Sequence, residues 1–310
     1  MSITITGGIT LNGGGWTIVA PPAGNKAIFG YGYTTTNVSM TNLVSNTGVV
    51  ATDTTGVGTA RYTLAAAGYG TDKAIFGYGF MISPSILQLS VTNKVSNTGV
   101  VATDTTGVGS ARDNPSAACY GTDKAIFGYG YTSDNTAITN LVSNTGVVAT
   151  DTAGVGTARR GLAAAGYGTD KAIFGYGFGA SGTVSMTNLV SNTGVVATDT
   201  TGVGTARVFL AAAGYGTDKA IFGYGDGASV TSITNLVSNT GVVATDTTGV
   251  GTARYTLAAA TYGTDKAIFG YGNSGSVTAI TNLVSNTGVV ATDTTGVGTA
   301  RKQLAAAAYG

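Results

Sequence analysis

Residues 73–79 read Lys-Ala-Ile-Phe-Gly-Tyr-Gly, and the same heptapeptide occurs five more times in the chain. The spacings between successive copies are 47, 51, 47, 48 and 47 residues, and the copies begin at Lys26, Lys73, Lys124, Lys171, Lys219 and Lys266. A second block, Ser-Asn-Thr-Gly-Val-Val-Ala-Thr-Asp-Thr, recurs from Ser45 onward, and a third surrounds an arginine of the Arg61 type. A fixed period of this length indicates a protein built from one repeated supersecondary unit.

Each period contains four stretches with the character of short strands. Residues 61–69 are small and apolar, residues 73–78 are apolar and aromatic, and the turn 70–72 between them predicts a hairpin. Two further strands are expected at 92–97 and 100–105, separated by Asn-Thr-Gly. Glycines interrupt every candidate helix, and no apolar residues recur at helical spacing. The sequence therefore predicts an all-β fold, a six-bladed β-propeller of four-stranded antiparallel blades.

The two ends of the chain predict how the ring closes. Residues before Lys26 lack the Arg-x-x-Leu-Ala-Ala-Ala block, whereas the chain ends at Gly310 directly after such a block. We therefore expect the C-terminal strand to pair with the first strand after Asn25, so that both ends share one blade. Alanines 65–67 are expected to line the hub, because converging strands leave no room for large side chains. The domains are then an N-terminal segment, 1–24, and a propeller, 25–310.

The order of these blocks resembles the kelch repeat over residues 26–310. Ala-Arg, a small apolar strand, a short hairpin and an apolar strand ending in Gly77-Tyr78-Gly79 are followed by Thr-Asn-x-Val and a return to Thr-Ala-Arg. The family's double glycine is replaced by Gly-Tyr-Gly, and Val100 and Val101 stand where it has an aromatic residue. The family's Trp and His positions are missing. The resemblance implies a propeller, while the missing positions argue against the known ligands and partners of the family.

Composition excludes several classes of function. The 310 residues carry a net charge of +1 with no basic stretch, so nucleic acid is not an expected partner. No apolar stretch is long enough to cross a membrane, no basic leader is present, and the single Cys119 excludes an internal disulfide. We expect a protein made in the cytoplasm, without membrane insertion.

The chain has no His and no Glu, which removes most acid–base and metal chemistry. Among propellers, copper oxidases need His ligands, which this chain lacks. Sialidases use an Arg cluster, a Tyr nucleophile and acidic partners, but this chain has no Glu and no Ser-x-Asp-x-Gly-x-x-Trp box. The aspartates fall mainly into two repeated sets, the Asp53 type and the Asp72 type, whereas glycoside hydrolysis needs two carboxylates in unlike surroundings. We predict no enzyme activity, no catalytic residue, no metal site and no cofactor. The repeated Arg61 and Asp53 types are expected to anchor the inner strand through ion pairs or backbone hydrogen bonds rather than to form a binding ring.

Two positions vary between copies: one follows each Gly-Tyr-Gly and the other follows each repeated arginine. In an up-and-down meander both emerge on one face. One interpretation is drift of unconstrained loops, and the other is a recognition face whose aromatic and polar groups suit sugars or protein partners. The residues predicted to bind a ligand or partner are Tyr33, Tyr62, Phe80, Met81, Ile82, Tyr131, Phe178, Asp226, Tyr255 and Asn273. The spacing of 51 predicts an inserted loop over 80–87, whose apolar residues would be buried against a partner.

The first residues, Met-Ser-Ile-Thr-Ile-Thr-Gly-Gly, weakly resemble the Gly- and Thr-rich starts of bacteriophage virion proteins. Pro21-Pro22 separates them from the first repeat, so residues 1–24 are predicted to mediate attachment or oligomerisation through Ile3, Ile5, Ile9, Leu11 and Trp16. The resemblance implies a tail or fibre component of the virion that contacts other virion proteins and a glycan or protein of the host surface. The alternatives are a cytoplasmic kelch-like scaffold or lectin, and an enzyme of unknown type.

Overall fold

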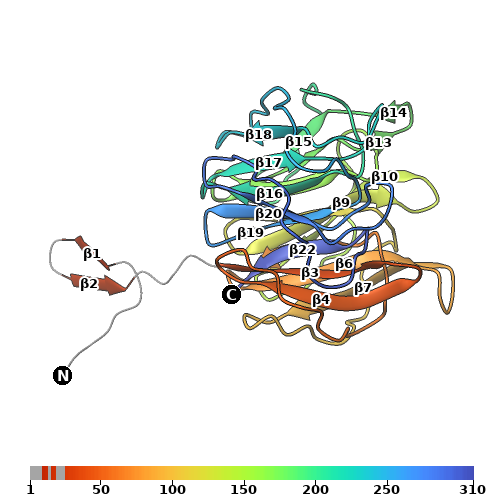
Figure 1. The fold of residues 1–310 in the computed structure, drawn as a ribbon, viewed down its shortest axis with the longest axis horizontal. Coiled ribbons are helices and arrows are strands. Elements are labelled where there is room, and N and C mark those ends of the chain that lie inside the picture. The colour runs from red at the N-terminus through yellow and green to blue at the C-terminus, as the bar shows by residue number, and fades with distance from the viewer. Residues whose placement is uncertain (1–8, 13–14, 19–24) are drawn as a thin grey trace.

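The computed structural model describes residues 9–12, 15–18 and 25–310. Those residues are all-β: they form six three-stranded antiparallel sheets and two short two-stranded ones, and they contain no helix. Accordingly, no helix within these ranges is long and apolar enough to cross a membrane. Figure 1 shows the strands of successive repeats arranged one sheet after another.

We number the three-stranded sheets I to VI and give each as its first, second and third strand. Sheet I contains β22 (Ala305–Tyr309), β3 (Lys26–Tyr33) and β4 (Asn37–Val44). Sheet II contains β5 (Ala65–Tyr69), β6 (Lys73–Met81) and β7 (Leu87–Val95). Sheet III contains β8 (Ser116–Tyr120), β9 (Lys124–Tyr131) and β10 (Asn135–Val142). Sheet IV contains β11 (Ala163–Tyr167), β12 (Lys171–Gly175) and β15 (Thr187–Val190). Sheet V contains β16 (Ala211–Tyr215), β17 (Lys219–Gly223) and β18 (Thr234–Val237). Sheet VI contains β19 (Ala258–Tyr262), β20 (Lys266–Gly270) and β21 (Thr281–Val284). The two-stranded sheets are β1 (Ile9–Asn12) with β2 (Gly15–Ile18) and β13 (Phe178–Gly179) with β14 (Gly182–Thr183).

The C-terminal strand completes the first sheet, which confirms that prediction. β22 pairs antiparallel with β3, with Tyr309 opposite Lys26 and Ala307 opposite Ile28. Figure 1 shows the blue C-terminal strand beside the red β3. The two ends of residues 25–310 also meet directly, because Asn25 N donates to Gly310 O at 3.1 Å.

The predicted fourth strand is not a continuous strand. In sheet I two isolated bridges, Val44 to Val50 and Thr41 to Thr54, tie this segment to β4. Residues 50–54 therefore lie opposite residues 41–44, and the one extra residue prevents a regular ladder. The Asn42 side chain bonds the segment where the ladder fails, since its Nδ2 donates to Ala51 O at 3.0 Å.

The loop predicted over residues 80–87 is shorter in the structure and spans residues 82–86. β6 continues to Met81, which pairs with Leu87 at the start of β7. A bulge between Gly77 and Gly79, with Tyr78 at a φ of 62°, lets the two strands resume pairing beyond it. Met81 is only 9% exposed, so one of the apolar residues assigned to an exposed loop belongs to the core.

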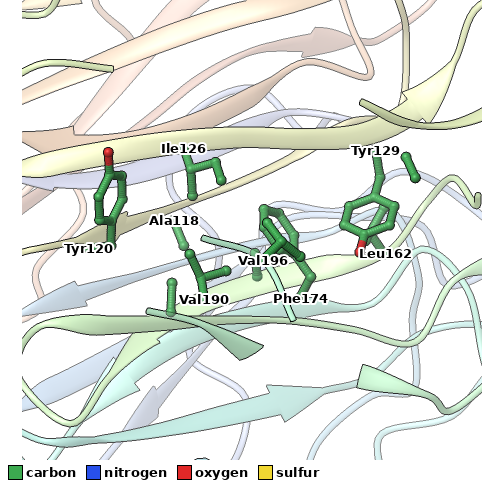
Figure 2. Packing of buried hydrophobic residues seen from close by; sticks show 11 residues of the cluster. Ala118, Tyr120, Ile126, Tyr129, Leu162, Phe174, Val190 and Val196 are labelled. Carbon is green, nitrogen blue, oxygen red and sulfur yellow. The ribbon is translucent and has the colours of Figure 1, made fainter. Parts of the chain in front are cut away.

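Side chains of the second strand pack between adjacent sheets. Phe76 of sheet II contacts Ile28 and Tyr31 of sheet I, while its neighbour Ile75 packs with Phe127 of sheet III. Successive residues of a strand point to opposite faces, so one strand serves both interfaces. Figure 2 shows the equivalent layer between sheets III and IV, where Ile126 and Tyr129 meet Phe174.

The first strands contact one another in the order β22, β5, β8, β11, β16, β19 and back to β22. This cycle is supported at one end by backbone hydrogen bonds from the turn glycines. Gly70 N donates to Asp123 O of the next sheet at 2.7 Å, and the series continues through every repeat until Gly310 N donates to Asp72 O at 2.8 Å. The small side chains predicted for this strand permit such close approach of six backbones.

Candidate functional site

The repeated arginines are buried structural residues, as predicted. Arg61 has 0% exposure, and its guanidinium lies 4.4 Å from the centre of the Tyr31 ring. Its Nε donates to Tyr78 O, its Nη1 to Thr59 O and its Nη2 to Asn93 Oδ1, at 2.8, 3.0 and 2.8 Å. Because these donors are satisfied inside the sheet, the arginine set cannot serve as a ring of ligand-binding cations.

The Asp53 set completes this internal network. Asp104 accepts hydrogen bonds from Asn93 Nδ2 at 2.8 Å and from Thr59 N at 3.0 Å. Burial opposes its ionisation, but the hydrogen bonds from Thr59 and Asn93 and the charge of Arg61 outweigh burial and lower the pKa of Asp104. Burial raises the pKa of Tyr31 to about 12, although Arg61 opposes that rise. These groups keep one protonation state near neutral pH and hold the sheet together.

The two variable positions meet at one end of the sheets, as predicted. In every sheet the residue after the repeated arginine forms a bridge with the residue after Gly-Tyr-Gly. The six pairs are Lys302 with Tyr33, Tyr62 with Phe80, Asp113 with Tyr131, Arg160 with Phe178, Val208 with Asp226 and Tyr255 with Asn273. We call these twelve residues the rim.

Inside the rim, six residues form a closed cycle of backbone hydrogen bonds. Thr63 N donates to Gln303 O at 2.8 Å, Asn114 N to Thr63 O at 2.9 Å, and the series runs on through residues 161, 209 and 256 until Gln303 N donates to Thr256 O. All six have a positive φ between 50° and 60°. This conformation is unfavourable for residues such as Thr63 and Phe209. The cycle of bonds offsets that strain, and it depends on the backbone alone.

The cycle surrounds a small depression of about 80 Å³. Its floor contains leucines such as Leu64, and its wall contains the six cycle residues, which are of five different types. Backbone bonds therefore fix the platform, while its side chains are free to vary. This arrangement is typical of a scaffold that presents a binding surface.

Rim side chains gather into two groups that span neighbouring sheets. In the first, Tyr33 and Tyr62 have ring centres 5.2 Å apart, Tyr62 and Phe80 are 5.7 Å apart, and Lys302 Nζ lies 5.9 Å from the Tyr33 ring. In the second, the Arg160 guanidinium lies 4.6 Å from the Tyr131 ring and 5.4 Å from the Phe178 ring. The aromatic residues predicted from the sequence thus contact cations that the prediction did not include.

Asp113 lies beside these groups. Burial raises the pKa of its carboxyl, while hydrogen bonds from Gln88 and Asn114 and the charge of Arg160 oppose the rise. Gln88 Nε2 donates to Asp113 Oδ1 at 3.3 Å and to Tyr131 O at 3.0 Å. The extended hairpin of sheet II is therefore bonded to sheet III at the rim.

The ten predicted binding residues do not all reach the surface. Met81 and Asn273 are each only 9% exposed. Ile82 N donates to Asn37 Oδ1 at 3.1 Å, so Ile82 helps to anchor the hairpin to sheet I. Phe178 is exposed, and the other six are half-buried: Tyr33, Tyr62, Phe80, Tyr131, Asp226 and Tyr255.

Three functional candidates were missed: Arg160, Lys302 and Phe209. Each occupies a varying position directly after a repeated arginine or one residue later, where the prediction named only Tyr62 and Tyr255. Their position in the repeat was the available signal. Comparison of the equivalent residue in every copy would have identified them.

The predicted attachment residues Ile3 and Ile5 lie outside the described residues. Trp16 belongs to β2, where its backbone pairs with that of Leu11 in β1. Residues 1–24 thus include a short hairpin in their described part.

A larger cavity of about 420 Å³ lies at the opposite end of the first strands. Five first strands contribute to it, together with Lys171, Lys219 and the turn threonines. Cys119 lies on the wall of this cavity. Desolvation by the surrounding protein raises the pKa of its thiol. Within residues 25–310, the structure places no three His, Cys, Asp or Glu side chains where they could hold a metal ion.

No protein-family model matches the chain, and no curated protein sequence matches it significantly. The candidate site therefore rests on its geometry.

Proposed function

We propose that sheets I to VI are the blades of a six-bladed, kelch-like propeller. Two features of residues 25–310 support this interpretation: the first strands contact one another in a complete cycle, and backbone hydrogen bonds join all six repeats at both ends of those strands. In this architecture the bridged fourth segments are the outer edges of the blades. The C-terminal strand then closes the ring in sheet I.

We propose further that the protein is a non-enzymatic adhesion module whose rim and central cycle bind a glycan or protein. One observation carries this proposal: side chains vary at the rim and the cycle while the backbone beneath them is held by the same bonds in every repeat. Drift alone would also have altered the exposed turns at the opposite end, but Ser-Asn-Thr-Gly-Val is identical in all six copies. Because the longest varying stretches of the repeat lie at the rim end of the sheets, we favour recognition over drift.

The N-terminal resemblance favours a place in a bacteriophage tail or fibre, with residues 1–24 as the attachment segment. The host-surface ligand would then bind at the rim, and other virion proteins would bind the N-terminal segment. Detection of the chain in purified particles by mass spectrometry tests the virion assignment. Its absence from particles, with normal abundance in the cytoplasm, would favour the alternative of a cellular scaffold or lectin.

A pair of matched variants tests the binding surface. In the rim variant, Tyr62, Tyr131 and Phe178 are replaced by Ser; in the control, Val100, Val147 and Val195 of the opposite end are replaced by Ser. These valines are 61–66% exposed. On a glycan array and on intact host cells, we expect the rim variant to lose at least about tenfold in affinity, as contact residues at interfaces do, while the control binds normally. Equal loss in both variants, or loss only in the control, would refute the rim as the binding surface.

A further inference from the structure

The junction between sheets III and IV contains a cation whose hydrogen-bonding groups are unused. The Arg160 guanidinium is stacked against Tyr131 and Phe178, and it makes no hydrogen bond or ion pair with any side chain or backbone group in residues 25–310. The buried Arg159 next to it, by contrast, donates to Tyr176 O, Thr157 O and Asn188 Oδ1. Arg160 therefore retains its planar set of donors for a group outside this part of the chain.

Asn135 joins the two sheets at the same junction. Its Nδ2 donates to Phe178 O at 3.2 Å, so the aromatic residue beside Arg160 is bonded to sheet III. In sheet IV the chain turns back after Phe178 in the short hairpin of β13 and β14, and the Phe178 side chain remains exposed.

We infer that this junction binds an acidic sugar, with the carboxylate on Arg160 and the sugar ring against Phe178. A planar guanidinium bonds a carboxylate through two parallel N–H groups, and stacking on aromatic rings holds it in place for that contact. The exposed face of Phe178 offers an apolar surface for the sugar ring.

A sugar acid suits the junction better than an acidic peptide. In a hexuronic acid the carboxylate is attached directly to the ring, so one rigid unit presents a charge to Arg160 and an apolar ring face to Phe178. A peptide carboxylate is separated from its nearest donor by rotatable bonds, whose ordering would reduce affinity. The carboxylate of Asp113 near Arg160 is already bonded to Gln88 and Asn114, so it does not occupy the guanidinium.

The repeat supplies a matched control for the test. Lys302 occupies in sheet I the position that Arg160 occupies in sheet IV, so R160Q and K302Q each remove one positive charge from the same rim. The probes are methyl α-D-galacturonide and methyl α-D-galactoside, which differ only in the carboxylate, titrated into the full chain by calorimetry. Melting temperatures check that both variants fold, and R160K, which keeps the charge without the planar fork, provides a second variant.

We expect the galacturonide to bind at least about tenfold more tightly than the galactoside, in line with charge-assisted hydrogen bonds. R160Q and R160K should both lose this preference for the galacturonide, whereas K302Q should keep it. Equal binding of the two sugars would overturn the inference, as would equal loss in R160Q and K302Q, which would indicate a general electrostatic effect. Tighter binding of N-acetyl-aspartyl amide than of the galacturonide would assign the junction to an acidic peptide instead. The inference rests on the proposed recognition function, but the two can fail separately. If the galacturonide test fails while the rim variant still loses host-cell or array binding, the recognition function stands and only the acidic ligand is rejected.

Discussion

At the scale of single residues, two consecutive arginines have opposite roles. Arg159 is fully buried with three acceptors satisfied, whereas Arg160 is half-buried at the rim with its donors unused. Their positions in the repeat differ, since Arg159 is the repeated arginine after Thr-Ala and Arg160 is the varying residue that follows it. Their different surroundings lead to different predictions for stability.

Replacing Arg159 by Met should cost about 3–5 kcal/mol, because three buried oxygen acceptors would lose their donors. Replacing Arg160 by Met should change the free energy of unfolding by less than about 1 kcal/mol, as is usual at the surface. Urea unfolding followed by circular dichroism measures both values. Similar small effects for the two variants would contradict the structural role assigned to the buried set.

The Asp53 set makes stability depend on pH. Although burial opposes ionisation, hydrogen bonds from a Thr or Ser and from an Asn lower the pKa of each of these carboxyls in the folded state. A lowered folded-state pKa stabilises the fold above the unfolded pKa of about 4, and that contribution is lost as pH falls through the folded value. We therefore expect the melting temperature to be nearly constant from pH 7 to 5 and to fall steeply below pH 4.

A single substitution tests the assignment. Asp246→Asn should lower stability at pH 7. It should also reduce the acid-induced drop in melting temperature by at most about one sixth, because six equivalent aspartates contribute to that drop. Melting curves between pH 7 and 2.5 for both proteins measure this difference. An acid-dependent fall of unchanged size in the variant would show that other groups control acid unfolding.

At the scale of elements, the extended hairpin of β6 and β7 combines core and surface residues. Met81 and Leu89 are buried, whereas Ile86 and Leu87 are 78% and 51% exposed. Asn37 of sheet I bonds the hairpin through Ile82, and Gln88 bonds it to sheet III. The insertion is therefore a rigid element held on both sides.

Met81→Ala should destabilise the protein by about 2–3 kcal/mol through the cavity it leaves. Ile86→Ser should leave stability within about 0.5 kcal/mol, because its side chain is exposed. Chemical denaturation distinguishes the two variants, and the rim-binding assay shows whether Ile86 contacts a partner. A loss of stability in Ile86→Ser equal to that in Met81→Ala would mean that the tip of the hairpin is packed in solution.

At the scale of the whole molecule, the two ends of residues 25–310 are joined through sheet I. Opening the proposed ring between any two sheets leaves the others intact, but separating the chain ends requires breaking the ladder between β22 and β3. A circular permutant can remove this joining of the two chain ends through the ladder between β22 and β3. One Thr between Gly310 and Asn25 recreates the Gly-Thr-Asx-Lys turn found at residues 121–124, and the new ends are placed between Thr55 and Gly56.

This permutant should fold but melt several degrees below the unpermuted chain 25–310, because contacts between sheets alone then close the ring. Calorimetry and unfolding rates compare the two proteins, and the unpermuted chain also tests whether residues 1–24 are dispensable for folding. Equal melting temperatures and unfolding rates would show that the shared sheet contributes nothing to closure.

The sequence by itself determined the number of repeats, the all-β class, the order of the first three strands, and the pairing of the C-terminal strand with β3. These features follow from the repeated blocks and their spacing, and from blocks present or missing at the two ends. Only the tertiary structure decided that the fourth segment forms bridges, that residues 63 and 209 adopt a positive φ, and that Arg160 stands between Tyr131 and Phe178. The physical reason is that these features depend on bulges and on contacts between residues of separate strands and neighbouring sheets, and neither leaves a periodic pattern in the chain.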